Sequence, residues 1–176
     1  MFYPPSDRRK LVSCQANRVI KSIARTEKII EASPEKVFEV LADARNYAYW
    51  VVGSKEIREV DADWPSVGSR FHHTVGFGPF KVKDHSEVEE VEAPGLLKLK
   101  VKARPFGTGR VTMEMIEIAK GRTHVTMTED AGDALTAILF NPLTHLLVRG
   151  RNVESLKRLA ELAEDGPADL DRAMNT

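Results

Sequence analysis

Hydrophobic positions near the C-terminus recur every three or four residues, which predicts one long amphipathic helix from Pro142 to Glu164. Asn141 stands at an N-cap position, and Pro142 stands at the first helical position, where a backbone N–H is not needed. At about 1.5 Å per residue, such a helix spans about 35 Å, the width of a small domain. The predicted apolar stripe consists of Leu139, Leu143, Leu146, Gly150, Val153, Leu156, Ala160 and Ala163. A broad layer of other elements must cover this stripe.

The chain before this helix alternates between apolar and polar residues, as β-strands do. A first strand is expected at 22–32, and six more are expected near 54–61, 69–77, 80–91, 96–104, 109–119 and 122–130. Ser33 and Pro34 start a short helix that ends near Asp43, and a second short helix or turn follows at 44–50. Because short turns join the later strands, we expect antiparallel neighbours. The order of elements is therefore one strand, two short helices, six strands and one long helix, which is an α+β fold class.

Composition limits the classes of function. The chain has 176 residues, 42% of them hydrophobic, which is enough for one domain at 22–164, with an N-terminal arm at 1–21 and a C-terminal tail at 165–176. The 26 basic and 26 acidic residues cancel, which argues against nucleic acid as a partner. No apolar stretch approaches the length of a membrane helix or of a signal peptide. The single cysteine, Cys14, favours a cytoplasmic location.

Three segments of the chain carry a resemblance to a known family. They are Ile30 to Phe38 with Leu41-Ala42-Asp43 and Trp50, the turn Val67-Gly68-Ser69, and Gly150-Arg151-Asn152 followed by Leu156 and Leu159. With the order of elements over 22–164, they resemble the START-related helix-grip superfamily (SRPBCC), and within it the polyketide cyclase/dehydrase-like branch. The resemblance implies a seven-stranded antiparallel sheet wrapped around the long C-terminal helix, with a cavity for lipids, sterols, polyketides, hormones or other apolar ligands. Members include binding proteins, transfer proteins and some cyclases, so catalysis stays open.

Strand alternation predicts which side chains face such a cavity, because residues two apart share a face. Leu97, Leu99 and Val101 alternate with three lysines, for example. The expected ligand-binding residues are Trp50, Phe71, Val75, Phe77, Val82, Ser86, Leu97, Leu99, Val101, Val111, Met113, Met115, Val125, Met127, Leu146, Gly150 and Val153. After Met115 the apolar positions shift to Ile116 and Ile118, which predicts a bulge. The alternative is that these residues simply fill a core.

Polar residues on the apolar face are the candidates for chemistry. His73 and Asp84 lie on strands joined by a short turn, with a parity that directs both inward. A carboxylate beside an imidazole raises its basicity, so the pair is a candidate catalytic base for enolising a carbonyl ligand; a structural pair is the favoured interpretation. Glu129, near a strand end, is expected to be exposed, and His145 is expected at the rim of the cavity.

Other kinds of site find no support. His72 and His73 are adjacent and point to opposite faces of a strand, without a cysteine pair or His-x-x-x-His, so no metal is expected. The chain has no glycine-rich phosphate loop, and no cofactor is expected. The sequence therefore predicts the binding of a small hydrophobic or amphipathic ligand. The alternatives are a polyketide cyclase or dehydratase that uses His73 and Asp84, and a protein-interaction domain with a collapsed cavity. The sequence leaves open whether the protein forms a homodimer.

Overall fold

The computed structural model describes residues 22–77, 80–102, 108–131 and 142–166. The predicted arm at 1–21 and residues 167–176 of the predicted tail lie outside this part. The elements are β1 (Ser22–Ile30), α2 (Pro34–Ala42), η1 (Ala44–Asn46), α3 (Tyr47–Trp50), β2 (Ser54–Val60), β3 (Arg70–Phe77), β4 (Phe80–Glu92), β5 (Leu96–Lys102), β6 (Thr108–Ala119), β7 (Arg122–Ala131) and α5 (Pro142–Asp165).

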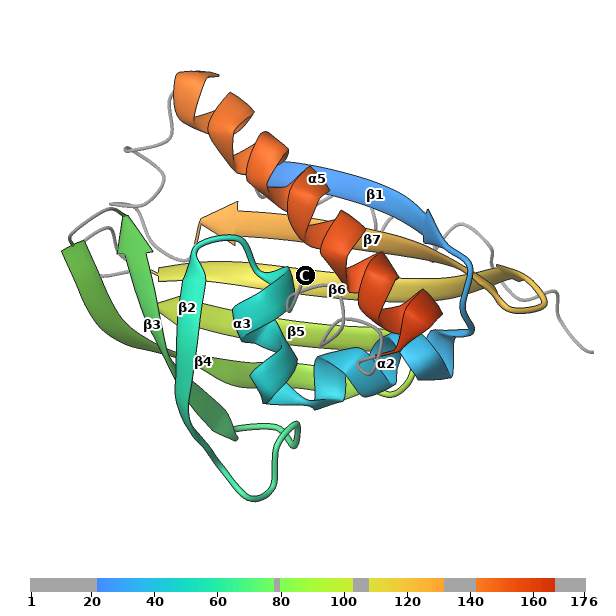
Figure 1. Ribbon diagram of the computed structural model, residues 1–176, viewed down its shortest axis with the longest axis horizontal. Helices are drawn as coiled ribbons and strands as arrows, with labels where there is room; N and C mark the ends of the chain where they lie inside the picture. The colour runs from blue at the N-terminus through green and yellow to red at the C-terminus, as the bar shows by residue number, and fades with distance from the viewer. Residues whose placement is uncertain (1–21, 78–79, 103–107, 132–141, 167–176) are drawn as a thin grey trace, which may run out of the picture.

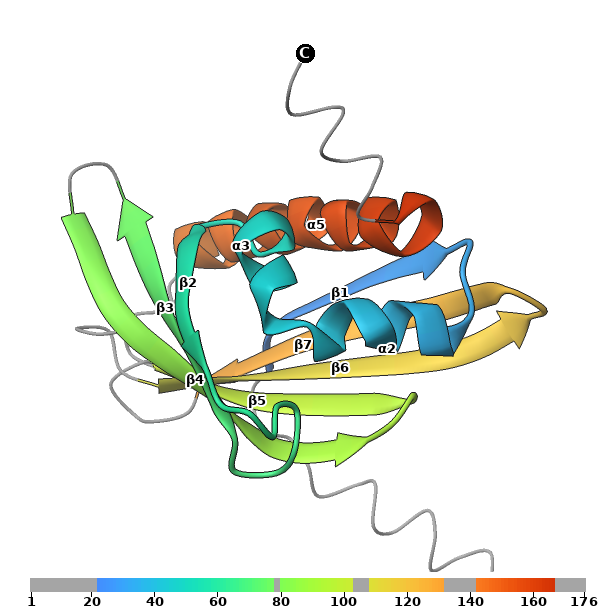
Figure 2. The ribbon, with the colours of Figure 1, turned by 60° about the horizontal axis from the view of Figure 1, so that its bottom comes forward.

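The seven strands form one antiparallel sheet with the order β1-β7-β6-β5-β4-β3-β2. In Figure 1, α5 crosses one face of this sheet diagonally. Figure 2 shows α2 and α3 on the same side as α5, and β3 and β4 bending toward the helices. The expected α+β helix-grip fold is therefore confirmed. Below, the face of the sheet that is turned toward the helices is called the inner face.

The short helices after β1 follow from local capping. Pro34 starts α2 at a position that needs no N–H, although the Ser33 side chain makes no capping bond. The helix ends at Asp43, whose Oδ1 accepts a hydrogen bond from the Arg45 backbone N–H at 2.9 Å and begins η1. Residues 44–50 therefore form the short helix η1 followed by α3, rather than a single helix.

The apolar core lies between one end of the sheet, α2 and the second half of α5. Leu97, Met113 and Val125 are at most 1% exposed on the inner face, and Leu156 and Leu159 of α5 are equally covered. Burying side chains of this size stabilises the fold by roughly 1.5–3 kcal/mol each. This end of the molecule is therefore filled by its own side chains.

The buried stripe of α5 differs from the predicted one in its first half. Val153 is 54% exposed and Gly150 is also exposed, whereas Asn152 and Ser155 are buried. Farther along, Leu156, Ala160 and Ala163 are buried as predicted. The prediction was wrong at Gly150 and Val153 because it placed only apolar or small residues inward.

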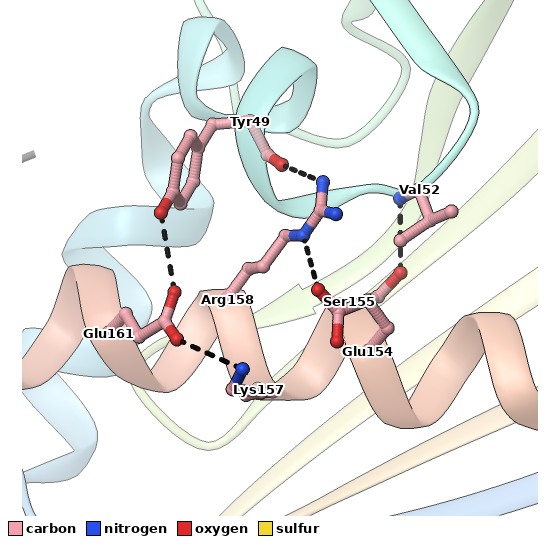
Figure 3. Close-up of polar contacts among 7 residues, drawn as sticks. All are labelled: Tyr49, Val52, Glu154, Ser155, Lys157, Arg158 and Glu161. Carbon is pink, nitrogen blue, oxygen red and sulfur yellow. Dashed lines mark hydrogen bonds and ion pairs between the residues drawn. The ribbon is translucent and has the colours of Figure 1, made fainter. Parts of the chain in front are cut away.

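A polar seam joins α3 and the turn after it to α5 (Figure 3). The Ser155 Oγ accepts a hydrogen bond from the Val52 backbone N–H at 3.1 Å, and Arg158 donates to the Tyr49 carbonyl at 3.3 Å. The Tyr49 hydroxyl donates to Glu161 at 3.3 Å. Because Val52 supplies a partner from a distant segment, Ser155 is stable on the buried side of the helix.

The outer face of the sheet carries the isoleucines that the sequence placed inside. Ile116 is 61% exposed and Ile118 is 50% exposed, whereas Met113 and Met115 stay inward. The pairing of β6 with β7 shifts register only between Glu117 and Ala119. The predicted change of face at Ile116 was therefore wrong.

Candidate ligand site on the inner face

Antiparallel register lines up inward-facing residues in rows across the sheet. One row runs through Val88, Leu99, Val111 and Glu129, from β4 to β7. The next row along the strands runs through Phe71, Ser86, Val101 and Gly109. Beyond it, His73 pairs with Asp84. The inner face thus changes from apolar to polar along its strands.

Solvent reaches the apolar residues at the polar end of this face. Val82, Val101 and Val111 are only half-buried although their strand parity directs them inward. Above this region, Arg149 and Gly150 of α5 are exposed. We call the region the open end and define it by His73, Val82, Asp84, Ser86, Val101, Gly109, Val111 and Glu129. Its apolar side chains are less covered than those of the core, so the open end is the part of the inner face where a ligand has least to displace.

His73 and Asp84 stand directly opposite each other in the antiparallel pair and are 5% and 2% exposed. Residues in such a pair have Cβ atoms about 4.5–5.5 Å apart. Burial is the main cause that lowers the pKa of His73 to about 4; the Asp84 carboxylate acts in the opposite direction, while His85, Arg58 and His72 lower the pKa further. The imidazole is therefore neutral near pH 7, and its Nδ1 has no hydrogen-bond partner within the described ranges.

Arg58 connects the backbones of both residues. Its Nη2 donates to the carbonyl oxygens of His73 and Asp84, at 3.4 Å in each case. Arg58 lies on β2, where the pairing with β3 shifts register between Ile57 and Glu59. This contact was not expected from the sequence, because a change of register reverses the face that strand alternation assigns.

An aromatic cluster lies beside His73 and connects β3 with α3. Phe71 is 5.3 Å from His73 between ring centroids, 4.7 Å from Tyr47 and 4.9 Å from Trp64, and Tyr47 is 4.9 Å from Trp50. Burial raises the pKa of the Tyr47 hydroxyl. Trp50 therefore acts as a packing residue of this cluster. Trp64 was missed in the sequence because it stands in a loop, outside any strand alternation.

A second polar group joins β7 to α5. Glu129 is 9% exposed and forms an ion pair with Arg151 of α5. The Arg151 Nε also donates to the Oδ1 of Asn152 at 3.2 Å. Asn152 is fully buried, and its Nδ2 has no hydrogen-bond partner in the part of the chain that the structure describes. The expectation that Glu129 is exposed was wrong, because α5 supplies a counter-charge that sequence neighbours do not reveal.

The structure places the predicted lining residues in four groups. Trp50, Phe71, Ser86, Leu97, Leu99, Met113, Met115, Val125 and Met127 are buried; Val82, Val101 and Val111 are half-buried; Gly150 and Val153 are exposed. The side chains of Val75, Phe77, Leu146 and His145 lie outside the described residues. Contact with a ligand stays a prediction for all of them.

A separate pocket of about 270 Å³ opens beside the first helices. Its walls come from Ala42, Asp43, Ala44, Arg45, Val60, Asp61, Ala62 and Trp64. Two of its carboxylates already accept backbone hydrogen bonds, since Asp43 caps η1 and the Asp61 Oδ2 accepts from the Arg70 N–H at 2.9 Å. This pocket shares only Trp64 with the aromatic cluster and none of the predicted site residues.

The described residues were also compared with the requirements of a metal site and of a membrane-spanning helix. Over 22–77, 80–102, 108–131 and 142–166, no three His, Cys, Asp or Glu side chains are grouped to hold a metal ion. None of the helices formed by these residues is long and apolar enough to cross a bilayer. His72 lies on the opposite face from His73 and stacks with His85 at 5.6 Å between ring centroids.

Comparison with known proteins places this geometry in a family. A family model described as polyketide cyclase / dehydrase and lipid transport matches residues 23–164. A protein of Chromobacterium violaceum has a similar structure, with a TM-score of 0.60 and 19% identity over 79% of this chain and 95% of that one. A conserved protein of Geobacillus kaustophilus follows, with a TM-score of 0.65 and 15% identity over 80% and 94% of the two chains. A protein of Thermus thermophilus has a TM-score of 0.61 and 18% identity over 82% and 98%. No curated protein matches the chain significantly in sequence.

Proposed function

We propose that this chain, which belongs to the polyketide cyclase/dehydrase and lipid transport family, binds a small hydrophobic or amphipathic ligand between its sheet and α5. The observation that carries the proposal is the incomplete burial of Val82, Val101 and Val111 on the inner face. A side chain that turns inward and still meets water gains free energy, about 25 cal/mol per Å² of apolar area, when a ligand covers it. Lipids and aromatic polyketides both offer such a surface.

The polar groups beside these valines favour an amphipathic ligand. Ser86, Asp84 and Glu129 lie within two rows of Val101 and Val111. The other end of the inner face is closed by Met113, Met115 and Leu159, which are at most 3% exposed. The ligand therefore occupies the open end, with its apolar part against the valines. The single cysteine supports the cytoplasmic location that we also propose.

Titration with the neutral fluorescent probe N-phenyl-1-naphthylamine tests this function. We expect wild-type protein to bind the probe and Val111→Trp or Val101→Trp to weaken binding at least tenfold, because indole fills the space over the sheet. Ile116→Trp, on the exposed outer face of β6, is the matched control and is expected to change affinity less than twofold. Thermal melts identify any variant that fails to fold. Absence of probe binding by the wild type, or equal losses in the inner and outer variants, would contradict the proposal.

A second candidate function is acid/base catalysis by His73 and Asp84. The observation that favours it is the neutral, buried imidazole of His73, whose Nδ1 has no partner among the described residues, opposite a buried carboxylate. A neutral imidazole can accept a proton from the carbon next to a ligand carbonyl and return it to a departing hydroxyl as water leaves. The net reaction would convert a β-hydroxy carbonyl compound into an α,β-unsaturated carbonyl compound and water.

Turnover separates the two candidates. Incubation with β-hydroxy ketones, followed by mass spectrometry, is expected to show loss of water if His73 is catalytic. His73→Gln should then abolish turnover while probe affinity stays within about tenfold, which corresponds to about 1.4 kcal/mol. Unchanged product formation in this variant would exclude His73 from the reaction, whereas absence of product from the wild type would leave ligand binding as the function.

A further inference from the structure

We propose that Asn152 of α5 donates a hydrogen bond to an uncharged carbonyl or hydroxyl oxygen of the ligand. The proposal deepens the binding function and rests on it. Asn152 is fully buried, yet its Nδ2 has no hydrogen-bond partner among the residues that the structure describes. A buried amide donor without a partner lowers stability, so the Asn152 Nδ2 group calls for an acceptor that the described residues do not supply.

The neighbouring arginine fixes which end of the Asn152 amide is the donor. The Arg151 Nε, which can only donate, is bonded to the Asn152 Oδ1 at 3.2 Å. If the amide were turned by 180°, two donors would face each other. The Nδ2 group is therefore the end that is left to meet a ligand.

The charges around Asn152 select an uncharged acceptor. Arg151 is the cation that contacts Asn152 among the described residues, and its guanidinium already forms an ion pair with Glu129. Because the two charges cancel, this group offers no net positive charge to a carboxylate. A ketone, ester or hydroxyl oxygen can accept from Asn152 without the larger desolvation cost of an anion.

The position of Asn152 in the fold indicates how the ligand is oriented. Glu129 is the register partner of Val111, one of the half-buried valines of the open end. Asn152, linked to Glu129 through Arg151, borders this region from the helix side. The apolar body of the ligand is then placed over Val101 and Val111, and its oxygen is turned toward α5.

Prodan, a neutral naphthyl ketone whose emission shifts to the red when its carbonyl accepts a hydrogen bond, is a suitable probe. We expect Asn152→Leu, which keeps the shape but removes the amide, to weaken prodan binding at least fivefold and to shift its emission to the blue. Binding of N-phenyl-1-naphthylamine, which has no carbonyl, should change less than twofold. The melting temperature should stay equal or rise, because the unpartnered Nδ2 donor is removed and the Arg151 Nε, on a side chain that is 40% exposed, can bond to water in place of the Asn152 Oδ1.

Ser155→Ala is the matched control, because Ser155 is a buried polar residue of the same helix whose hydroxyl already has a partner, the Val52 N–H. Its melting temperature should fall, whereas prodan affinity and emission should stay unchanged. A lower melting temperature for Asn152→Leu together with unaltered prodan binding would assign Asn152 a structural role and overturn the proposal.

The charge argument has its own test. Competition against N-phenyl-1-naphthylamine should show wild type binding 2-decanone at least fivefold more tightly than decanoate. Glu129→Gln removes the counter-charge of Arg151 and should raise the affinity for decanoate at least fivefold relative to that for 2-decanone. Tighter binding of decanoate than of 2-decanone by the wild type would overturn the inference and leave the binding function intact. Failure of wild type to bind any of these compounds would refute both.

Discussion

His73 of β3 and Asp84 of β4 are direct partners in the antiparallel sheet, and both side chains are buried on the inner face. The pair lies at the same end of the sheet as Val82 and Ser86, where the inner face changes from apolar to polar residues. Burial keeps the imidazole uncharged, since it lowers the pKa of His73 from 6.5 to about 4. Burial therefore makes the stability of the fold depend on pH, and it makes His73 a weaker base than the expected effect of the Asp84 carboxylate alone would give.

The first prediction concerns acid stability. In the unfolded chain His73 takes up a proton near pH 6.5, whereas in the folded chain it does so only near pH 4. The unfolded state therefore binds more protons between these values, and the contribution of His73, full above pH 6.5, is lost as the pH falls toward 4. We expect about 3 kcal/mol of the free energy of unfolding to disappear over this range.

Urea unfolding of the wild type and of His73→Gln at pH 7 and pH 4 measures this contribution. Because the other titrating groups are common to both proteins, the difference between their pH slopes isolates His73. Equal slopes would show that His73 is not buried in its neutral form.

The second prediction concerns the ion pair between Glu129 and Arg151. Arg151→Met keeps much of the side-chain volume but leaves the Glu129 carboxylate, whose side chain is 12% exposed, without its counter-charge. We expect a loss of about 1–3 kcal/mol, moderated by the 40% exposure of the Arg151 side chain. The double variant Glu129→Gln with Arg151→Met should recover part of the lost free energy of unfolding. A double-mutant cycle by urea unfolding gives the coupling, and additive losses would argue against the pair.

The third prediction concerns the seam between α3 and α5. Ser155→Ala removes the acceptor of the Val52 N–H and is expected to cost about 1 kcal/mol, because a backbone donor is left without its partner. Lys157→Ala removes an exposed partner of Glu161 at 3.8 Å on the same helix and should cost less than about 0.5 kcal/mol. Thermal unfolding of both variants compares them directly, and a larger loss for Lys157→Ala would contradict the assignment.

The fourth prediction separates the two faces of β6. Met113→Ala empties a position that is 1% exposed and is expected to cost about 2–5 kcal/mol. Ile116→Thr, at 61% exposure, should stay within about 0.5 kcal/mol of the wild type. Chemical denaturation measures both, and a large loss for Ile116→Thr would mean that the outer face of the sheet is covered in solution.

Local patterns predicted the elements of the fold, and the family resemblance predicted how they assemble. Alternation located the seven strands to within a few residues, and the Ser33-Pro34 signal located α2. The helix predicted to end at Glu164 ends at Asp165, and Gly166 follows it with a φ of 80°. Parity also directed His73 and Asp84 to one face. These features follow from the sequence because each depends on residues only a few positions apart.

The tertiary structure decided which polar residues are inside. Ser155 is buried because Val52, 103 residues earlier, donates to it, and Glu129 is buried because Arg151 of α5 lies against it. Neither partner can be identified from hydrophobic periodicity, which counts a serine or a glutamate as a surface residue. For the same reason periodicity did not place Asn152 inward, although the residue is part of the family resemblance. The sequence by itself determined the helix-grip architecture and its apolar face, whereas only packing between distant segments determined where that face becomes polar.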